Sequence, residues 1–202
     1  MNSADTIAYF GFGSLVNLNT LTTPYIAAHR AKLDGWRRVW LPRPSTAPHI
    51  LAGMPPLAFL SAEPSPGIII DGMVVVDHAA SLPALDLREV MYKRTPIGTG
   101  SLTALDENAG ALQARSDLFL YVAEQEADPD SVEPRPSILR SYLDAVFQGF
   151  LHNFGDEALE RFVFTTRNFH LPVLEDRDNP IYPRHVTLSR REKIRFDSIE
   201  LR

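Results

Sequence analysis

The chain has 202 residues, of which 45% are hydrophobic and 22% are charged, a balance that excludes disordered and fibrous proteins and suits one folded domain. The absence of cysteine excludes disulfides, thiolate metal sites and thiol nucleophiles. A formal net charge of −5 and the lack of a signal peptide or a long apolar span argue against a polyanion binder or a membrane protein. We therefore expect a soluble cytoplasmic protein that binds neither nucleic acid nor a membrane.

The first hundred residues predict short strands joined by loops, because seven prolines between residues 42 and 66 disfavour helices. Apolar and β-branched runs mark the strands, and the glycines mark turns or bulges. The predicted elements are a strand over 6–13 that ends in a glycine turn, a strand or hairpin over 27–40 with a bulge or turn at Gly35, a hairpin or bulged strand over 66–76 around Asp71-Gly72, and a helix over 81–92.

The second half of the chain is more helical. A short strand is predicted over 118–122, and a helix opens at Pro136-Ser137 because the apolar residues that follow have helical spacing. A shorter helix is predicted over 156–164. Regular alternation of strands and helices is missing, which argues against a doubly wound sheet. The pattern predicts a mixed α/β (α+β) domain on a small, mostly antiparallel or barrel-like sheet.

A glycine-rich segment, Gly11-Phe12-Gly13-Ser14, follows the first predicted strand. It is not a dinucleotide-binding fingerprint, since Val16 stands where the third glycine is needed, and Ser14 does not have the spacing of a hydrolase nucleophile. Glycines let the backbone turn tightly, so that its N–H groups converge on an anion such as a carboxylate. An ordinary turn from strand to loop explains the spacing equally well.

A second segment, Leu85-Asp86-Leu87-Arg88-Glu89, places two acids three residues apart. On its own, this spacing favours a capping box with Asp86 as N-cap, or a helix surface pair between Glu89 and Lys93. The six histidines are scattered without metal-ligand spacing, so we expect no metal site.

Together the two segments resemble the γ-glutamylcyclotransferase-like family. The family's Tyr-Gly-Ser-Asn-Leu-type loop is matched by residues 9–14, and its later Leu-Asp-x-x-Glu is matched by residues 85–89. Between them, residues 33–37 (Leu-Asp-Gly-Trp-Arg) match a Leu-x-Gly-Tyr/Trp-Arg segment, and Tyr142 and Gly149 keep the family's spacing of a tyrosine and a helical glycine. The resemblance covers roughly residues 7–150. Phe12 replaces a tyrosine and Leu15 replaces an asparagine, which leaves the choice of substrate open.

The resemblance implies a small, compact, mostly antiparallel β-barrel with peripheral helices. It also implies that a γ-glutamyl group cyclises to 5-oxoproline and releases an amine or amino acid, without a cofactor. Glu89 would be the catalytic acid and base. The residues that would bind the small-molecule γ-glutamyl substrate are Tyr9, Phe10, Gly11, Phe12, Gly13, Ser14, Leu15 and Tyr142.

Two alternatives stay open. Phe12 and Leu15 favour a non-catalytic binding protein for small molecules on the same scaffold. An enzyme with a changed reaction, such as removal of a γ-glutamyl group from an amine or from a carrier-bound intermediate in biosynthesis, is also compatible. We expect residues 1–202 to form a single domain, with 162–202 as a C-terminal extension packed on it. Residues 169–184 are rich in proline and aromatic residues, which predicts an ordered loop at the mouth of the pocket. The sequence does not predict an oligomeric state.

Overall fold

The structure is a computed structural model that describes residues 5–21, 24–43, 54–98, 100–107, 110–113, 115–123 and 128–201. The strands are β1 (Thr6–Gly11), β2 (Ala27–Pro42), β3 (Ala58–His78), β4 (Tyr92–Pro96), β5 (Leu102–Ala104), β6 (Leu118–Ala123), β7 (Ile138–Leu139), β8 (Thr166–Arg167) and β9 (Val173–Leu174). The α-helices are α1 (Leu82–Arg88), α2 (Gly110–Gln113), α3 (Arg140–Phe154), α4 (Glu157–Phe164) and α5 (Arg190–Asp197).

The main sheet is mixed and has the strand order β4-β6-β1-β3-β2-β5. Strand β1 pairs antiparallel with β3 and parallel with β6, while β8 adds a second parallel pairing at β2. The predicted barrel is wrong: within the described residues β4 and β5 are the two ends of this order, and they do not pair. Helices α3 and α4 bury apolar side chains in the same core as the strands, so the sheet need not close on itself to exclude water.

The longest strands, β2 and β3, form an antiparallel pair that is interrupted once. The register jumps from Asp34–Ile69 to Trp36–Pro64, which confirms a bulge at Gly35, where φ is +81°. The alternative of a hairpin at Asp71-Gly72 is wrong, because both residues pair with β2 in the middle of β3. A Cβ on Gly72 would collide with the Phe10 ring and the Gly11 carbonyl oxygen, so β1 crosses this point only because the residue is glycine.

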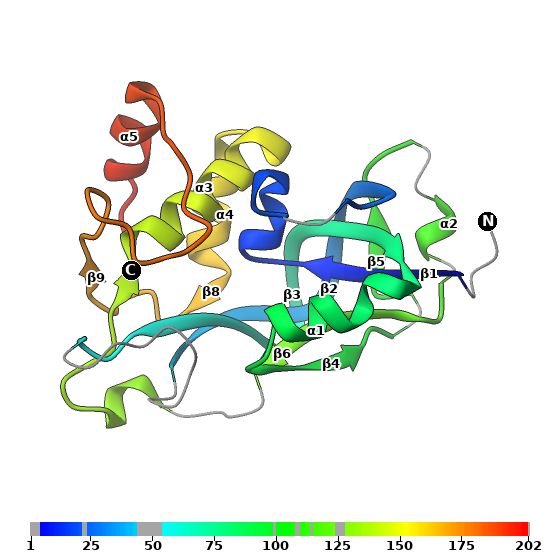
Figure 1. Cartoon of the computed structure of the whole chain (residues 1–202), viewed down its shortest axis with the longest axis horizontal. Coiled ribbons are helices and arrows are strands. Elements are labelled where there is room, and N and C mark those ends of the chain that lie inside the picture. The colour runs from blue at the N-terminus through cyan, green and yellow to red at the C-terminus, as the bar shows by residue number, and fades with distance from the viewer. Residues whose placement is uncertain are drawn as a thin grey trace.

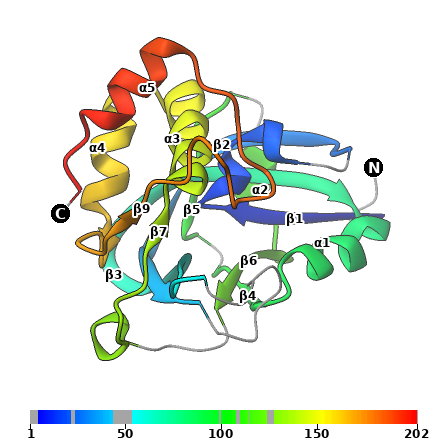
Figure 2. The same ribbon diagram turned by 60° about the vertical axis from the view of Figure 1, so that its left-hand side comes forward.

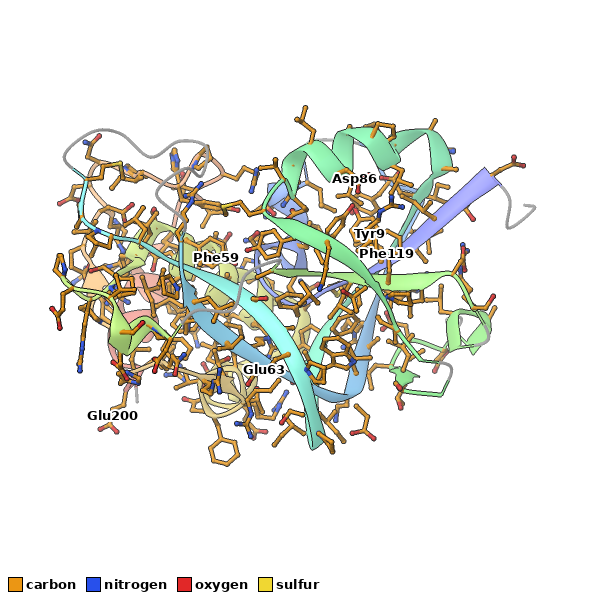
Figure 3. The ribbon with its side chains drawn as sticks, turned by 90° about the horizontal axis from the view of Figure 1, so that it is seen from below. Tyr9, Phe59, Glu63, Asp86, Phe119 and Glu200 are labelled. Carbon is orange, nitrogen blue, oxygen red and sulfur yellow. The ribbon has the colours of Figure 1, made fainter. Side chains whose placement is uncertain are left out.

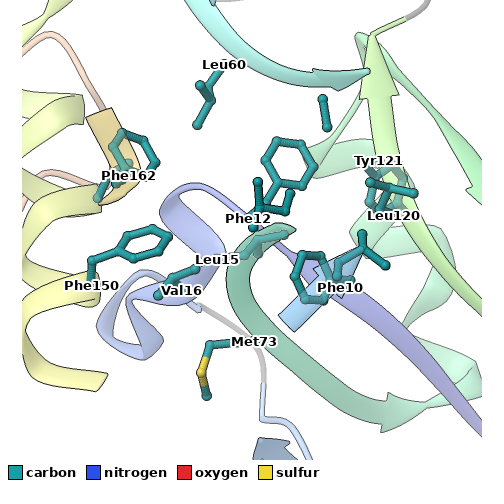
Figure 4. Close-up of a cluster of buried hydrophobic side chains, with 14 of the residues drawn as sticks. Phe10, Phe12, Leu15, Val16, Leu60, Met73, Leu120, Tyr121, Phe150 and Phe162 are labelled. Atoms are coloured by element: carbon teal, nitrogen blue, oxygen red, sulfur yellow. The ribbon is translucent and has the colours of Figure 1, made fainter. Parts of the chain in front are cut away.

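Helices α3, α4 and α5 gather at one end of the sheet, and α1 lies toward the other end (Figures 1 and 2). Phe150 of α3 and Phe162 of α4 project toward the loop that carries Phe12 and Leu15 (Figure 4), and all four belong to one buried cluster. Helix α3 begins at Arg140 and not at residue 136, because residues 138–139 pair with β9. In the part of the chain that the structure describes, no helix is long and apolar enough to cross a membrane.

The C-terminal segment packs on the rest of the molecule. Phe169, Leu171 and Phe196 are buried in the main core, and Tyr182 is buried in a smaller cluster with residues of α3. Helix α5 begins with a capping box between Ser189 and Glu192. Residues 169–184 therefore lie in contact with the domain in the structure.

Candidate functional site

Two adjoining cavities meet beside the glycine-rich loop. Their volumes are about 240 Å³ and about 40 Å³. Both are lined by the same five residues: Ser14, Leu60, Glu89, Tyr92 and Tyr142. We call them the larger and the smaller cavity of the candidate site.

A third hollow, of about 430 Å³, lies elsewhere, between β2, β3, β6 and residues 128–130. None of the predicted site residues lines it. Glu63, which lines it, lies well apart from Asp86 of α1 (Figure 3). We therefore place the candidate site at the other two cavities, although this hollow is larger in volume.

The glycine-rich loop ends β1 and turns into a short 3₁₀ helix over Ser14–Val16. A Cβ on Gly13 would lie 2.8 Å from the Tyr142 hydroxyl oxygen and 3.0 Å from Leu60, so glycine permits this close approach. The Ser14 backbone donates a hydrogen bond to the Tyr142 hydroxyl. The amides of Gly13 and Leu15 have no acceptor among the described residues. Both residues line the smaller cavity, so their N–H groups are placed to donate to a ligand oxygen there.

Helix α3 is held tightly against this loop. The Asn17 side-chain amide donates to the Ala145 carbonyl at 2.9 Å and to Gln148 Oε1 at 3.0 Å. A Cβ on Gly149 would lie only 2.6 Å from the Asn17 backbone nitrogen, so any larger residue would push the helix away. This contact places Tyr142, one turn before Ala145, against the loop. Burial raises the pKa of Tyr142 well above its ordinary value, which keeps its hydroxyl protonated.

Glu89 lies directly after the last residue of α1. The capping-box and surface-pair alternatives are wrong, because Asp86 is inside the helix, Glu89 is at its C-terminal end, and Lys93 belongs to β4. The helix ends four residues earlier than predicted, since β4 begins at Tyr92. Arg88 Nε donates to Glu89 Oε1 at 2.9 Å, and the two side chains are 10% and 14% exposed.

Arg88 is more enclosed than an arginine at a helix end usually is. Its Nη1 donates to the Thr20 carbonyl at 3.1 Å. Its Nη2 is buried and finds no hydrogen-bond partner within the described ranges. A buried donor without an acceptor costs about 1–3 kcal/mol, so this atom is a natural point for ligand contact.

Arg38 supports the loop from behind and is itself fully buried. Its Nε donates to the Phe12 carbonyl at 2.8 Å, its Nη1 donates to Thr165 at 3.0 Å, and its Nη2 donates to the Asp71 carbonyl. The guanidinium lies between the rings of Phe150 and Phe162, 4.9 and 4.7 Å from their centroids. Burial lowers the pKa of Arg38. Because it joins the loop to β3 and to the end of α4, Arg38 fixes where the loop amides lie.

One wall of the larger cavity comes from the C-terminal segment, at residues 181–184. The Tyr182 ring packs edge-on against the Tyr142 ring, with centroids 5.0 Å apart, and Arg184 Nε donates to the Tyr182 hydroxyl at 3.1 Å. Burial opposes the charge of Arg184, but its interactions with Tyr182 and the negative charge of Glu89 raise its pKa overall. Arg184 is therefore a cation at the cavity wall.

Asp176 anchors this wall to the start of α3. Its carboxylate accepts hydrogen bonds from the Ser141 amide at 2.8 Å, the Ser141 hydroxyl at 2.5 Å and the Ile181 amide at 2.9 Å. The Ser141 hydroxyl oxygen accepts a further bond from the Tyr182 amide at 3.2 Å. Because Ser141 adjoins Tyr142, this network ties residues 181–184 to the tyrosine in the cavity.

The structure brings most of the sequence-predicted site residues together. Tyr9 and Gly11 line neither cavity: Tyr9 packs against Phe119 with ring centroids 6.1 Å apart (Figure 3), and Gly11 pairs with Met73 in the sheet. The predicted residues that line the smaller cavity are Phe10, Phe12, Gly13, Ser14, Leu15, Glu89 and Tyr142.

The predicted site residues do not include five arginines and tyrosines that line the larger cavity, namely Arg43, Arg88, Tyr92, Tyr182 and Arg184. Arg88 and Tyr92 had a usable signal, since they lie one residue before and three residues after Glu89. Tyr182 and Arg184 belong to residues 169–184, which the sequence predicts as a loop at the mouth of the pocket without singling out either residue, and Arg43 comes from a distant segment without a motif.

The site therefore combines a carboxylate, free backbone donors, tyrosine hydroxyls and arginines around one hollow. Such a set can bind an anionic or carbonyl-bearing ligand and transfer a proton to or from it. In the described part of the chain, no three histidine, aspartate or glutamate side chains cluster as metal ligands.

Comparison by sequence finds no matching protein-family model and no matching curated protein. Comparison by structure does find similar folds. A γ-glutamyl cyclotransferase is 16% identical, with a TM-score of 0.53, and the match covers 88% of this chain and 98% of that one. An uncharacterized protein from Homo sapiens is 18% identical, with the same two coverages and a TM-score of 0.54.

YkqA from Bacillus subtilis is 17% identical, with a TM-score of 0.57; the match covers 85% of this chain but 57% of YkqA. The chain thus has the fold of a γ-glutamyl cyclotransferase, an α+β fold on a mixed sheet.

Proposed function

We propose that the chain is an enzyme that cyclises a γ-glutamyl group to 5-oxoproline and releases an amine or amino acid. The observation that carries the proposal is the position of Glu89, which lines both cavities and shares the smaller one with Gly13 and Leu15, whose amides have no acceptor among the described residues. The fold, shared with a γ-glutamyl cyclotransferase, supports it.

The reaction needs little beyond positioning and proton transfer. The α-amine of the γ-glutamyl group attacks its own γ-carbonyl carbon, a five-membered ring closes, and the bond from that carbon to the departing nitrogen breaks. Because the nucleophile is tethered, holding the reactive conformer captures much of the advantage of an intramolecular reaction. The smaller cavity would hold the glutamyl part, with the Gly13 and Leu15 amides donating to its α-carboxylate or its carbonyl oxygen.

Glu89 would move the proton. The resting amine is an ammonium, so one proton must leave to solvent before attack. The attacking nitrogen gives up a second proton as the ring closes, and the departing nitrogen receives one as it leaves. One carboxylate at the ring-closing centre can take the proton from the ring nitrogen and pass it to the departing nitrogen. Its Oε1 accepts from Arg88, while its Oε2 has no partner among the described residues and is available for the transfer.

The test measures 5-oxoproline formation from glutathione, γ-glutamyl amino acids and γ-glutamyl amines. Glu89→Gln should lower turnover by about 10²–10⁴, because glutamine accepts a hydrogen bond but cannot take a proton. It keeps an acceptor for Arg88 Nε, so we expect a folded protein with a melting temperature lowered by a few degrees.

Asp86→Asn is the matched control, a carboxylate of the same segment that lines neither cavity and accepts from Tyr121 at 2.7 Å. It should keep most of the turnover. If Glu89→Gln retains more than about a tenth of the activity, Glu89 is not the acid and base. Binding of γ-glutamyl compounds without 5-oxoproline would favour a binding protein on this scaffold, the role that Phe12 and Leu15 suggest.

A further inference from the structure

A chain of hydrogen bonds joins the end of α1 to the glycine-rich loop. Arg88 Nε donates to Glu89 Oε1 at 2.9 Å, and Arg88 Nη1 donates to the Thr20 carbonyl at 3.1 Å. The Thr20 hydroxyl donates in turn to the Ser14 carbonyl at 2.8 Å. Resting on the proposed function, we propose that Arg88 and Thr20 are positioning residues that hold the Glu89 carboxylate at a fixed place relative to the loop amides.

Thr20 is a firm anchor for the arginine. It is buried, and its hydroxyl lies within hydrogen-bond distance of two carbonyl oxygens, that of Ser14 at 2.8 Å and that of Asn17 at 2.9 Å. Its amide donates to the Asn17 carbonyl at 2.8 Å, within the short 3₁₀ helix over Leu18–Thr20. Because the Asn17 side chain is bonded to α3, the Thr20 carbonyl is fixed to both the loop and that helix.

Arg88 is suited to join the two segments. Its guanidinium is planar and rigid, so Nε and Nη1 donate in different directions at once, which the single ammonium of a lysine cannot reproduce. The Arg88 and Glu89 side chains are 10% and 14% exposed, so solvent screens their ion pair weakly. Within the described residues the Glu89 side chain forms no other hydrogen bond, so its place depends on this arginine.

The place of the carboxylate matters more for the chemical step than for binding. The proton passes from the ring nitrogen to the departing nitrogen, so the carboxylate must lie within hydrogen-bond reach of both. Arg88 holds Oε1, which restricts the side chain and leaves Oε2 for the transfer. Misplacing a catalytic group by about 1 Å can lower a rate about a hundredfold, whereas the loop amides would bind substrate without Glu89. Loss of either positioning residue should therefore lower kcat more than it raises KM.

Thr20→Val tests the positioning role without altering the cavity walls, since Thr20 lines neither cavity. Valine keeps the shape, and both carbonyls keep a backbone donor, because the Asn17 amide donates to Ser14 at 3.0 Å and the residue 20 amide donates to Asn17. With the panel substrate of highest kcat/KM, kcat should fall at least about threefold while KM stays within about twofold.

Thr166→Val is the matched control. Thr166 is also buried, its hydroxyl donates to the Phe162 carbonyl at 2.5 Å, and it lines neither cavity of the candidate site. The control variant should melt a few degrees below wild type, because it loses one buried hydrogen bond, yet it should keep the wild-type kcat.

Arg88 is tested through its dependence on Glu89. Arg88→Met should lower kcat at least about tenfold, and Arg88→Lys should give an intermediate kcat because lysine reaches one of the two partners at a time. In the Glu89→Gln background Arg88→Met should lower kcat no further, since a positioning residue acts only through the carboxylate. Arg190→Gln, an exposed arginine at the start of α5, is the control and should keep the wild-type kcat.

The outcomes separate this inference from the proposed function. It is overturned if Thr20→Val or Arg88→Lys keeps the wild-type kcat, or if Arg88→Met slows Glu89→Gln by the same factor as it slows wild type. If Arg88→Met does not fold, the first two variants decide. If wild-type protein forms no 5-oxoproline from any compound of the panel, the proposed function fails, and crystal structures of wild type and Thr20→Val decide the positioning alone: a displaced Glu89 carboxylate supports it, and an unmoved one overturns it.

Discussion

The Asp176 carboxylate is predicted to hold the C-terminal wall of the site, and Asp176→Asn tests this. Its two oxygens accept three hydrogen bonds, from two backbone amides and one hydroxyl. Asparagine places an oxygen at only one of the two positions. In its better orientation it keeps the bonds from the Ser141 hydroxyl and the Ile181 amide, and its NH₂ group faces the Ser141 amide, donor against donor.

The magnitude follows from this count. Losing one bond to a charged acceptor costs about 1.5–3 kcal/mol, and making the other two neutral costs about 1 kcal/mol each. The sum is about 3.5–5 kcal/mol, which in a domain of this size lowers the melting temperature by about 10 °C or more. Because Tyr182 and Arg184 follow the anchored residue, KM for γ-glutamyl compounds should rise several-fold in the same variant.

The control is Glu175→Gln at the neighbouring residue. Glu175 is largely exposed and pairs with Arg140 at 2.8 Å, so its loss should cost under about 1 kcal/mol. Melting temperatures of the two variants are measured by calorimetry under the same conditions. The reasoning is refuted if Asp176→Asn melts within about 2 °C of wild type.

Three further predictions concern the loop and the buried tyrosine. Gly149→Ala should destabilise the fold by about 1–3 kcal/mol and lower turnover, because its Cβ overlaps the Asn17 backbone; unchanged melting would show that the helix shifts freely. Arg38→Met should leave the Phe12 carbonyl without its donor, cost about 1–3 kcal/mol in denaturant titration and raise KM; a lower KM would contradict a role in placing the loop. Above about pH 10 the unfolded chain releases tyrosine protons that buried Tyr142 keeps, so the free energy of unfolding should fall with rising pH. In Tyr142→Phe that slope should be less steep by about 1.4 kcal/mol per pH unit, and an equal slope would refute the assignment.

The elements with strong local patterns were predictable from the sequence. Strands β1 and β6 and helices α3 and α4 lie where apolar periodicity placed them, with ends displaced by a few residues. Whether the sheet closes into a barrel was not predictable, because closure depends on whether the two edge strands pair, and these strands are far apart in the strand order. The β-branched runs around Asp71-Gly72 left a hairpin and a bulged strand open, and pairing of both residues with β2 continues the strand through this point, with β1 pairing from Met73 onward.

The candidate site divides in the same way. The loop and Glu89 were predictable because each belongs to a short contiguous motif. Arg38 and Asp176 form hydrogen bonds with Phe12 and Ser141, which lie 26 and 35 positions away in the sequence. Arg184 is held by Tyr182, whose own position depends on a hydrogen bond to Ser141, 41 positions away. No spacing in the sequence encodes such partners, so only the folded chain identifies them.

The end of α1 explains why Glu89 reaches the cavities. In the longer helix predicted over 81–92, Arg88 and Glu89 would point about 100° apart. Instead the chain leaves the helix at Glu89, with φ −102° and ψ 36°, and turns into β4 through a bond from the Tyr92 amide to the Glu89 carbonyl at 2.8 Å. A carboxylate at the C-terminal end of a helix is disfavoured by the partial negative charge of the free carbonyls, and Arg88 offsets that cost. Glu89 thus lies where the partial charges of the helix end disfavour a carboxylate, and its pair with Arg88 stabilises it there. Such a position favours a chemical role for this acid over a role in stability.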